Sequence, residues 1–113
     1  MPSARNQPEG DSHISADKSW VVYIIISSDD KLYTGISNNP AKRWHAHNHT
    51  KQAAKFFRGR TPKTLAYLER GHNRSSASQR EAQIKKLSRQ KKLQLLDSQS
   101  ELDWHLELGL SQS

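Results

Sequence analysis

One carboxylate occupies an unusual position in the sequence and is a candidate for chemistry. Glu81 falls in a stretch with helical periodicity, about 40° from Ala77 and about 60° from Ile84 around the helix axis. Glu81 is therefore predicted within or beside the apolar face of a helix. A carboxylate there must be hydrogen-bonded, ion-paired or bound to a metal. The sequence leaves open a salt bridge to Arg80 or Lys85, or a metal ligand.

Two basic side chains share one helix face earlier in the chain. Arg43 and His47 are four residues apart, so a helix would place them on the same side. The planar guanidinium of arginine suits a phosphate, to which it can donate two parallel hydrogen bonds. Histidine can move a proton near neutral pH. The pair is either part of a phosphate site or an exposed basic stripe.

Two tyrosines lie on what we expect to be the paired strands of a hairpin. An odd-length connection would put Tyr23 and Tyr33 on the same face of the sheet, and a two-residue turn would not. The sequence does not fix that register, and buried tyrosines often serve only for packing. Gly35 follows two residues after Tyr33, where it would allow a close approach of another group or a bend at the strand end.

The charge distribution is typical of a polyanion-binding protein. The 113-residue chain has a formal net charge of +7. Residues 40–92 contain 15 lysines and arginines but only two acids, Glu69 and Glu81, while the flanking segments are acidic overall. This pattern indicates nucleic-acid binding, although a well-solvated basic surface would look the same.

Composition narrows the class of protein. The length predicts a single domain. The absence of cysteine excludes disulfides, thiolate zinc sites and cysteine nucleophiles. The longest apolar run, residues 20–26, is far shorter than the roughly 20 residues of a membrane helix, and the first residues do not form a secretion signal. We therefore expect a cytoplasmic protein that does not bind membranes.

The expected elements form a small α/β domain of the α+β sandwich type. Its largely antiparallel, three-stranded sheet is flanked by helices. Predicted strands are residues 20–26, 31–36 and 64–69, with the first strand central because it is apolar throughout. A helix from about residue 40 to 48 would be capped by Asn38 or Asn39, and residues 49–64 read as a loop.

From residue 77 to Leu96 the chain is predicted to be helical. A helix over residues 77–88 would be capped by Ser75 or Ser76, and a further helical segment through Leu93 and Leu96 continues it or follows a break. The tail is ambiguous, because residues 103–110 alternate like a strand whereas Ser98 and Glu101 have capping-box spacing. The expected divisions are a disordered tail over 1–18, a domain over 19–97 and a C-terminal extension over 98–113.

The order of these features resembles the GIY-YIG nuclease superfamily. The resemblance rests on two short motifs, Val22-Tyr23-Ile24 and Tyr33-Thr34-Gly35, followed by the Arg43 and His47 pair and then by Glu81. Two longer segments, residues 55–60 and 80–89, support it. The sequence looks most like small stand-alone bacterial members, which are similar to the nuclease domain of the excision-repair incision enzyme. The resemblance covers residues 19–96 and implies the same small, helix-flanked sheet.

The resemblance also implies roles for individual residues. Tyr23 would help to activate the attacking water, and Tyr33 would lie near the scissile phosphate. Arg43 would stabilise transition-state charge, and His47 would assist proton transfer. Glu81 would ligate one divalent metal, Mg²⁺ or Mn²⁺.

From these roles we expect a metal-dependent DNA endonuclease with weak sequence specificity, directed to particular structures or to single strands. RNA is a second possible substrate, and the protein is expected to be a monomer or weak homodimer. The predicted phosphate contacts are Lys42, Lys55, Arg58, Arg60, Lys85 and Lys86. One alternative is a non-catalytic nucleic-acid-binding module, since some members use an asparagine after the metal ligand and none follows Asn73 here. Another is a protein-interaction adaptor that uses residues 104–110.

Overall fold

A three-stranded antiparallel sheet with helices on both faces forms the framework of the protein. The computed structural model describes residues 18–49 and 55–110. The strands are β2 (Trp20–Ser27), β3 (Leu32–Ser37) and β4 (Pro62–His72), in the order β3-β2-β4. The predicted fold is thereby confirmed, with β2 as the central strand. The predicted tail over residues 1–18 lies outside the described residues except for its last residue.

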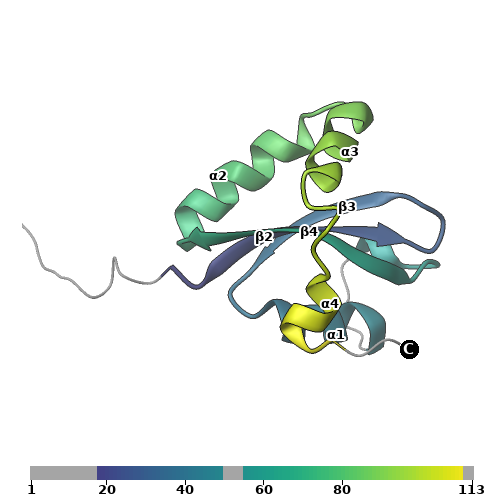
Figure 1. Cartoon of the computed structure of the whole chain (residues 1–113). Coiled ribbons are helices and arrows are strands. Elements are labelled where there is room, and N and C mark those ends of the chain that lie inside the picture. Colours follow the sequence, from purple (N-terminus) through teal and green to yellow (C-terminus); the bar gives the residue numbers. More distant parts are fainter. Residues whose placement is uncertain (1–17, 50–54, 111–113) are drawn as a thin grey trace, which may run out of the picture.

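Four α-helices and one short 3-10 helix occur in the described part of the chain. They are α1 (Pro40–His49), η1 (Lys55–Phe57), α2 (Arg74–Lys85), α3 (Arg89–Asp97) and α4 (Trp104–Leu108). Helices α2 and α3 cover one face of the sheet, and α1 and α4 cover the other (Figure 1). We call these the α2 face and the α1 face. None of the helices in these ranges has the length and apolar character needed to cross a membrane.

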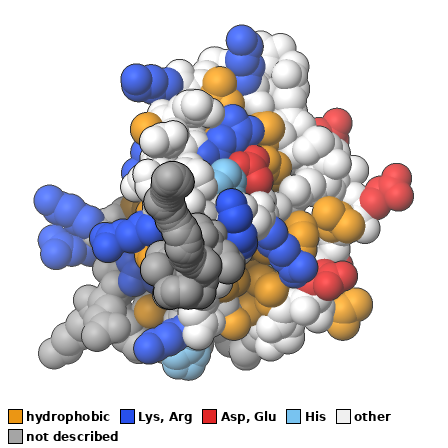
Figure 2. Space-filling view, turned by 90° about the vertical axis from the view of Figure 1, so that its left-hand side faces the viewer, with side chains coloured by type: hydrophobic (Ala, Val, Ile, Leu, Met, Phe, Trp, Pro, Cys, Tyr) orange, Lys and Arg blue, Asp and Glu red, His pale blue; other side chains and the backbone are white. Residues whose placement is uncertain are grey.

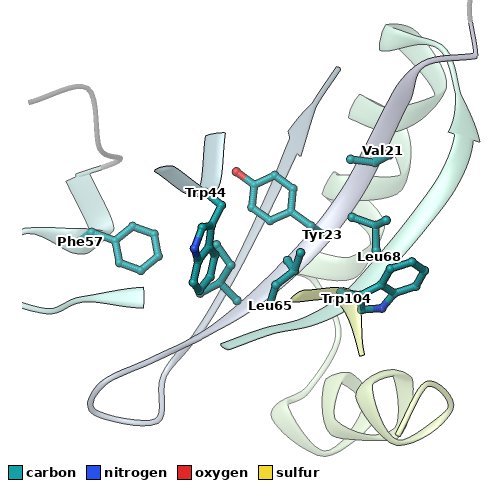
Figure 3. Close-up of a cluster of buried hydrophobic side chains, with 8 residues drawn as sticks. Val21, Tyr23, Trp44, Phe57, Leu65, Leu68 and Trp104 are labelled. Atoms are coloured by element: carbon teal, nitrogen blue, oxygen red, sulfur yellow. The ribbon is translucent and has the colours of Figure 1, made fainter. Parts of the chain in front are cut away.

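The alternating side chains of β2 supply two separate cores. Val22 and Ile24 pack with Tyr67, Ala77 and Ile84 on the α2 face. The other face receives the odd-numbered residues of β2, which pack in a larger cluster on the α1 face (Figure 3): Val21, Tyr23, Ile25, Trp44, Phe57, Leu65, Leu68 and Trp104. A strand that is buried on both faces must be apolar throughout, which explains the composition of residues 20–26.

Several predicted boundaries were wrong. The third strand runs from Pro62 to His72 rather than over 64–69, because β4 is an edge strand that tolerates proline at its first residue. The predicted loop over 49–64 contains η1. Helix α2 begins at Arg74 and ends at Lys85, and its cap is Asn73 rather than Ser75 or Ser76. For α1, Asn39 does accept a hydrogen bond from the N–H of Lys42, as expected of a cap.

The C-terminal residues form helices, and α4 packs on the sheet. Ser88 caps α3, so this helix follows a break after α2. Helix α4 is capped by Asp103, not by Ser98, and the strand alternative for this segment is wrong. His105 Nε2 accepts a hydrogen bond from the N–H of Leu65 at 2.9 Å, which ties α4 to β4. Trp104 joins the core of the α1 face.

Candidate active site

The hairpin turn settles the orientation of the two tyrosines. Tyr23 pairs with Gly35, and Ile25 pairs with Tyr33, across the β2–β3 ladder. Three residues, 28–30, form the connection, which ends on Asp30 in the left-handed conformation at φ 63°. Paired residues of an antiparallel ladder point to the same face. Tyr23, Tyr33 and Gly35 therefore share the α1 face, with ring centroids of the tyrosines 6.2 Å apart.

Helix α1 brings His47 directly against Tyr23. The Tyr23 hydroxyl and His47 Nε2 are 3.0 Å apart in a buried hydrogen bond. The His47 ring is also 5.3 Å from the Tyr33 ring, in an edge-on arrangement. Arg43, one turn earlier on α1, forms a hydrogen bond to Tyr23. The structure thus brings four of the five expected catalytic and metal-binding side chains into one cluster.

Burial keeps the two central groups uncharged. Burial raises the pKa of Tyr23, with a further contribution from Tyr33, and the nearby Arg43 only partly opposes this rise. Burial and the positive charge of Arg43 lower the pKa of His47 to about 4. Both groups are therefore neutral at neutral pH. Because the arginine can only donate, the phenol oxygen accepts from it. In the imidazole tautomer that carries its proton on Nδ1, the phenol proton points to Nε2.

Two phenylalanines complete the surroundings of this cluster. The Tyr33 ring centroid lies 5.2 Å from that of Phe56 and 5.1 Å from that of Phe57. His47 is 4.7 Å from Phe57. Neither phenylalanine could be assigned a role from the sequence, because both fall in a predicted loop. An adjacent aromatic pair between basic residues was the only available signal. These rings lower the local polarity around the cluster and so strengthen electrostatic interactions within it.

Gly35 leaves space for the two tyrosines. A Cβ atom at this position would lie 2.6 Å from the Tyr23 hydroxyl oxygen, 2.7 Å from its Cζ and 3.0 Å from Cε2 of Tyr33. Its backbone has an ordinary φ, so conformational freedom is not the reason for glycine. The residue instead allows the Tyr23 phenol to lie against the backbone of the edge strand β3.

Glu81 lies on the other side of the sheet. It belongs to α2, and its carboxylate forms an ion pair with Lys85 at 3.4 Å, with 23% of the glutamate side chain exposed. No group of three or more potential His, Cys, Asp or Glu ligands occurs in ranges 18–49 and 55–110. A single carboxylate suits Mg²⁺, which commonly retains several waters and binds substrate phosphate oxygens together with one or two carboxylates. The donor set therefore fits such a metal.

The other basic residues differ in their surroundings. Arg60 pairs with Asp29 at 3.1 Å and lies over the ring of Phe56. Lys85 pairs with Glu81. The remaining predicted phosphate contacts are exposed: Lys42, Lys55, Arg58 and Lys86. Lys and Arg predominate among the charged side chains on the face that Figure 2 shows. A surface of this kind attracts phosphates without reading sequence.

Known proteins are similar to this chain in sequence over most of its length. Residues 19–94 match the GIY-YIG catalytic domain family. A UPF0213 protein of Clostridium perfringens is 46% identical over 91 residues, which cover 79% of this chain and 97% of the relative. A UPF0213 protein of Syntrophus aciditrophicus is 46% identical over 80 residues, or 71% of this chain and 92% of the relative. No solved structure matches significantly. The chain therefore belongs to the GIY-YIG catalytic domain family, and its relatives are UPF0213 proteins.

Proposed function

We propose that the protein is a divalent-metal-dependent DNA endonuclease that hydrolyses phosphodiester bonds. The observation that supports it most strongly is the 3.0 Å hydrogen bond between Tyr23 and His47, beside Arg43 and in a buried aromatic cluster. A phenol that only packs in a core needs one hydrogen-bond partner. Here it has a cation on one side and a neutral base on the other. This arrangement suits the movement of a proton next to a bound anion.

The proposed proton path runs through the phenol. Tyr23 is a poor base by itself, because its pKa is raised. The attacking water gives a proton to the Tyr23 oxygen as the phenol proton moves to His47 Nε2. The water oxygen forms the new bond to phosphorus, and the bond from phosphorus to the leaving oxygen breaks. That oxygen takes a proton from solvent. A nearby phosphate raises the affinity of the imidazole for this proton.

Arg43 and Tyr33 would bind the reacting phosphate. The Arg43 guanidinium supplies a fixed positive charge where negative charge develops on the phosphate oxygens. Tyr33 is only half-buried, so its hydroxyl can donate a hydrogen bond to a substrate at the surface. Because neither residue reads a base, we expect weak sequence specificity and selection for structure or single-strandedness, with RNA as a further possible substrate.

Glu81 is the proposed ligand for Mg²⁺ or Mn²⁺. When bound, such an ion would supply Lewis-acid stabilisation of the phosphate. Helix α2 packs on β3, which is the edge strand of the sheet. A site at this edge would take Glu81 from α2 on one face and Tyr23 from β2 on the other.

A second candidate, a nucleic-acid-binding module without catalysis, is favoured by one observation. Lys85 already pairs with Glu81, and both belong to α2, which covers the face opposite the tyrosines (Figure 1). An ion pair of this partly exposed kind contributes only about 0–1 kcal/mol, so a metal could displace the lysine. The binding module predicts salt-sensitive DNA binding without cleavage.

The test is a cleavage assay with Mg²⁺ or Mn²⁺ on single-stranded, duplex, branched and nicked DNA. Wild type is compared with Tyr23→Phe, His47→Ala and Glu81→Ala. Tyr67→Phe is the matched control, because Tyr67 is also buried and hydrogen-bonded but lies on the α2 face. We expect losses of about 10²- to 10⁴-fold in the first three variants and none in the control. Equal residual cutting in all five proteins would refute the proposed active site. Binding without cutting would favour the binding module.

A further inference from the structure

A basic pocket lies beside the catalytic cluster, at the tip of the β2–β3 hairpin. It has a volume of about 300 Å³ and combines four cationic side chains with two apolar ones: Lys31, Arg60, Arg89, Lys92, Leu32 and Phe56. We call it the hairpin pocket. None of the residues that line it is acidic. Three of its cations, all except Arg60, were not among the predicted phosphate contacts.

The acids near this pocket leave positive charge unbalanced. Asp29 forms an ion pair with Arg60 at 3.1 Å, and Asp30 pairs with Lys63 at 3.0 Å. Arg89 donates a hydrogen bond to the backbone carbonyl of Asp30 rather than to a carboxylate. Within the described part of the chain, Arg89 and Lys92 form no ion pair. The pocket therefore has cationic donors available to an anion.

Helix α3 begins with charges of the unfavourable sign. The N-terminal end of a helix carries partial positive charge, which favours acidic side chains there. The first turn of α3 has no acid and its last turn has no base, whereas Arg89, Lys91 and Lys92 all lie near its start. This arrangement opposes the helix dipole and so costs stability. A bound anion would relieve it, because its negative charge would offset the cations and the positive end of the helix dipole.

Phe56 joins the pocket to the catalytic cluster. Its ring centroid lies 5.2 Å from that of Tyr33, and the Arg60 guanidinium carbon lies 4.6 Å from it on the pocket side. The Arg60 guanidinium is therefore within about 10 Å of the Tyr33 ring, which is the sum of those two distances. One DNA strand rises about 3.4 Å per nucleotide, so this distance spans no more than about three nucleotides.

We propose that the hairpin pocket binds a backbone phosphate of the substrate strand, within about three nucleotides of the scissile bond. The inference deepens the proposed function and rests on it for the position of that bond. The guanidiniums of Arg60 and Arg89 would donate to the phosphate oxygens, and Lys31 and Lys92 would add charge. Such a contact fixes how the strand crosses Tyr33 without reading its bases.

The pocket is tested by binding without metal, so that cleavage does not enter the measurement. The salt dependence of binding to a ten-nucleotide single strand is compared for wild type, Arg89→Ala/Lys92→Ala and Lys91→Ala. The last is the matched control, since it removes a charge from the same turn of α3 outside the pocket. We expect the slope of log affinity against log salt to fall by about 0.7 for each lost phosphate contact in the double variant. The control removes half as many charges, and its slope should fall by less than half as much. A fall in the control of half that in the double variant, or more, would overturn the proposal.

A second measurement identifies the phosphate. A neutral methylphosphonate is placed at each position of the strand in turn, and wild type should lose affinity most at one position. The double variant should not respond at that position, whereas Arg89→Lys/Lys92→Arg should respond as wild type does, which excludes a folding defect. A wild-type position dependence that persists in the double variant would overturn the proposal. If polyglutamate competes for binding as strongly as DNA of equal charge does, the proposal is also overturned. That result would favour an acidic protein partner.

The two proposals fail in different ways. If the protein cuts DNA but shows no position-dependent contact, the hairpin-pocket proposal is refuted and the endonuclease proposal stands. A protein that shows the contact but does not cut would retain the hairpin pocket as a DNA-binding site and lose the endonuclease. In a cutting protein, the distance from the sensitive phosphate to the cut must be three nucleotides or fewer, and a longer distance refutes the assigned path.

Discussion

The substitution Gly35→Ala should separate catalysis from stability. The added Cβ would lie 2.6 Å from the Tyr23 hydroxyl oxygen and 2.7 Å from its Cζ, whereas real Cβ contacts are essentially never below 3.0 Å. The phenol must therefore move by about 0.4 Å to reach that limit, and by about 0.8 Å to reach ordinary contact at 3.4 Å. The Tyr23 side chain is 3% exposed and packed in the α1-face core, so it has little room to move.

Two effects on stability oppose each other at this position. Overpacking of a filled core destabilises a protein by about 1–3 kcal/mol. Alanine is better than glycine in a strand interior by about 0.5–1 kcal/mol. Gly35 has no positive φ, so no backbone strain is added. We expect a net loss of about 1–2 kcal/mol in the free energy of unfolding. Cleavage should fall by about 100-fold, because an error of about 1 Å in a catalytic group costs on that order.

The assay combines denaturant unfolding with single-turnover cleavage at a temperature where every variant is folded. Gly71→Ala is the control, because Gly71 has a φ of +83° and an added Cβ there would have nothing within 4 Å. The left-handed conformation should cost that variant about 1–2 kcal/mol with no effect on cleavage. Wild-type stability and cleavage in Gly35→Ala would refute the reasoning, since the tyrosine would then move freely. Equal cleavage losses in both variants would show a general effect of stability.

Three further predictions concern pH, an ion-paired network and a helix cap. His47 should titrate with a midpoint of about 4 by NMR. The unfolded chain binds the proton near pH 6.5, so the stability contributed by neutral His47 should be lost as pH falls from about 6.5 to about 4. A titration midpoint of His47 at or above pH 6.5 would contradict the burial of its imidazole. Glu69→Gln should reduce the free energy of unfolding by about 1–2 kcal/mol, because Arg80 donates to both carboxylate oxygens at 3.1 Å. Cleavage by this variant should be unchanged when measured below its melting temperature, and a large loss would place the network in the active site. Asn73→Ala should cost about 1 kcal/mol in denaturant unfolding, because Asn73 caps α2, and an unchanged midpoint would show that Ser76 compensates alone.

The central strand and the first helix could be predicted because local patterns determine them. Residues 20–26 are apolar and mostly β-branched, which favours a strand buried on both faces wherever it lies. The first helix has its own cap in Asn39, next to a favourable proline. The end of β4 and the cap of α2 were harder to predict. Gly71 reads as a turn, yet the following His72 still pairs with Trp20 across the sheet.

The composition of the site depended on contacts that the sequence does not specify. Tyr23 and Tyr33 share a face only because three residues, not two, connect Ser27 to Lys31. Residues 28–31 include several turn formers, so the length of the connection was ambiguous. Phe57 reaches the cluster by tertiary packing of η1 alone. The C-terminal helix α4 likewise depends on Trp104, which packs in the core and donates to Gln99.

The electrostatics of the cluster suggest why a basic protein would keep its proton acceptor uncharged. Burial, assisted by the charge of Arg43, holds His47 in the neutral form, which is the form able to accept a proton. A phosphate that binds Arg43 would offset its charge and raise the basicity of His47 at the moment when water must be activated. The same phosphate would be drawn in by the surrounding lysines and arginines. Positive charge near the site would thus serve two purposes: it attracts the substrate, and it adds to burial in keeping the base deprotonated until the substrate neutralises that charge.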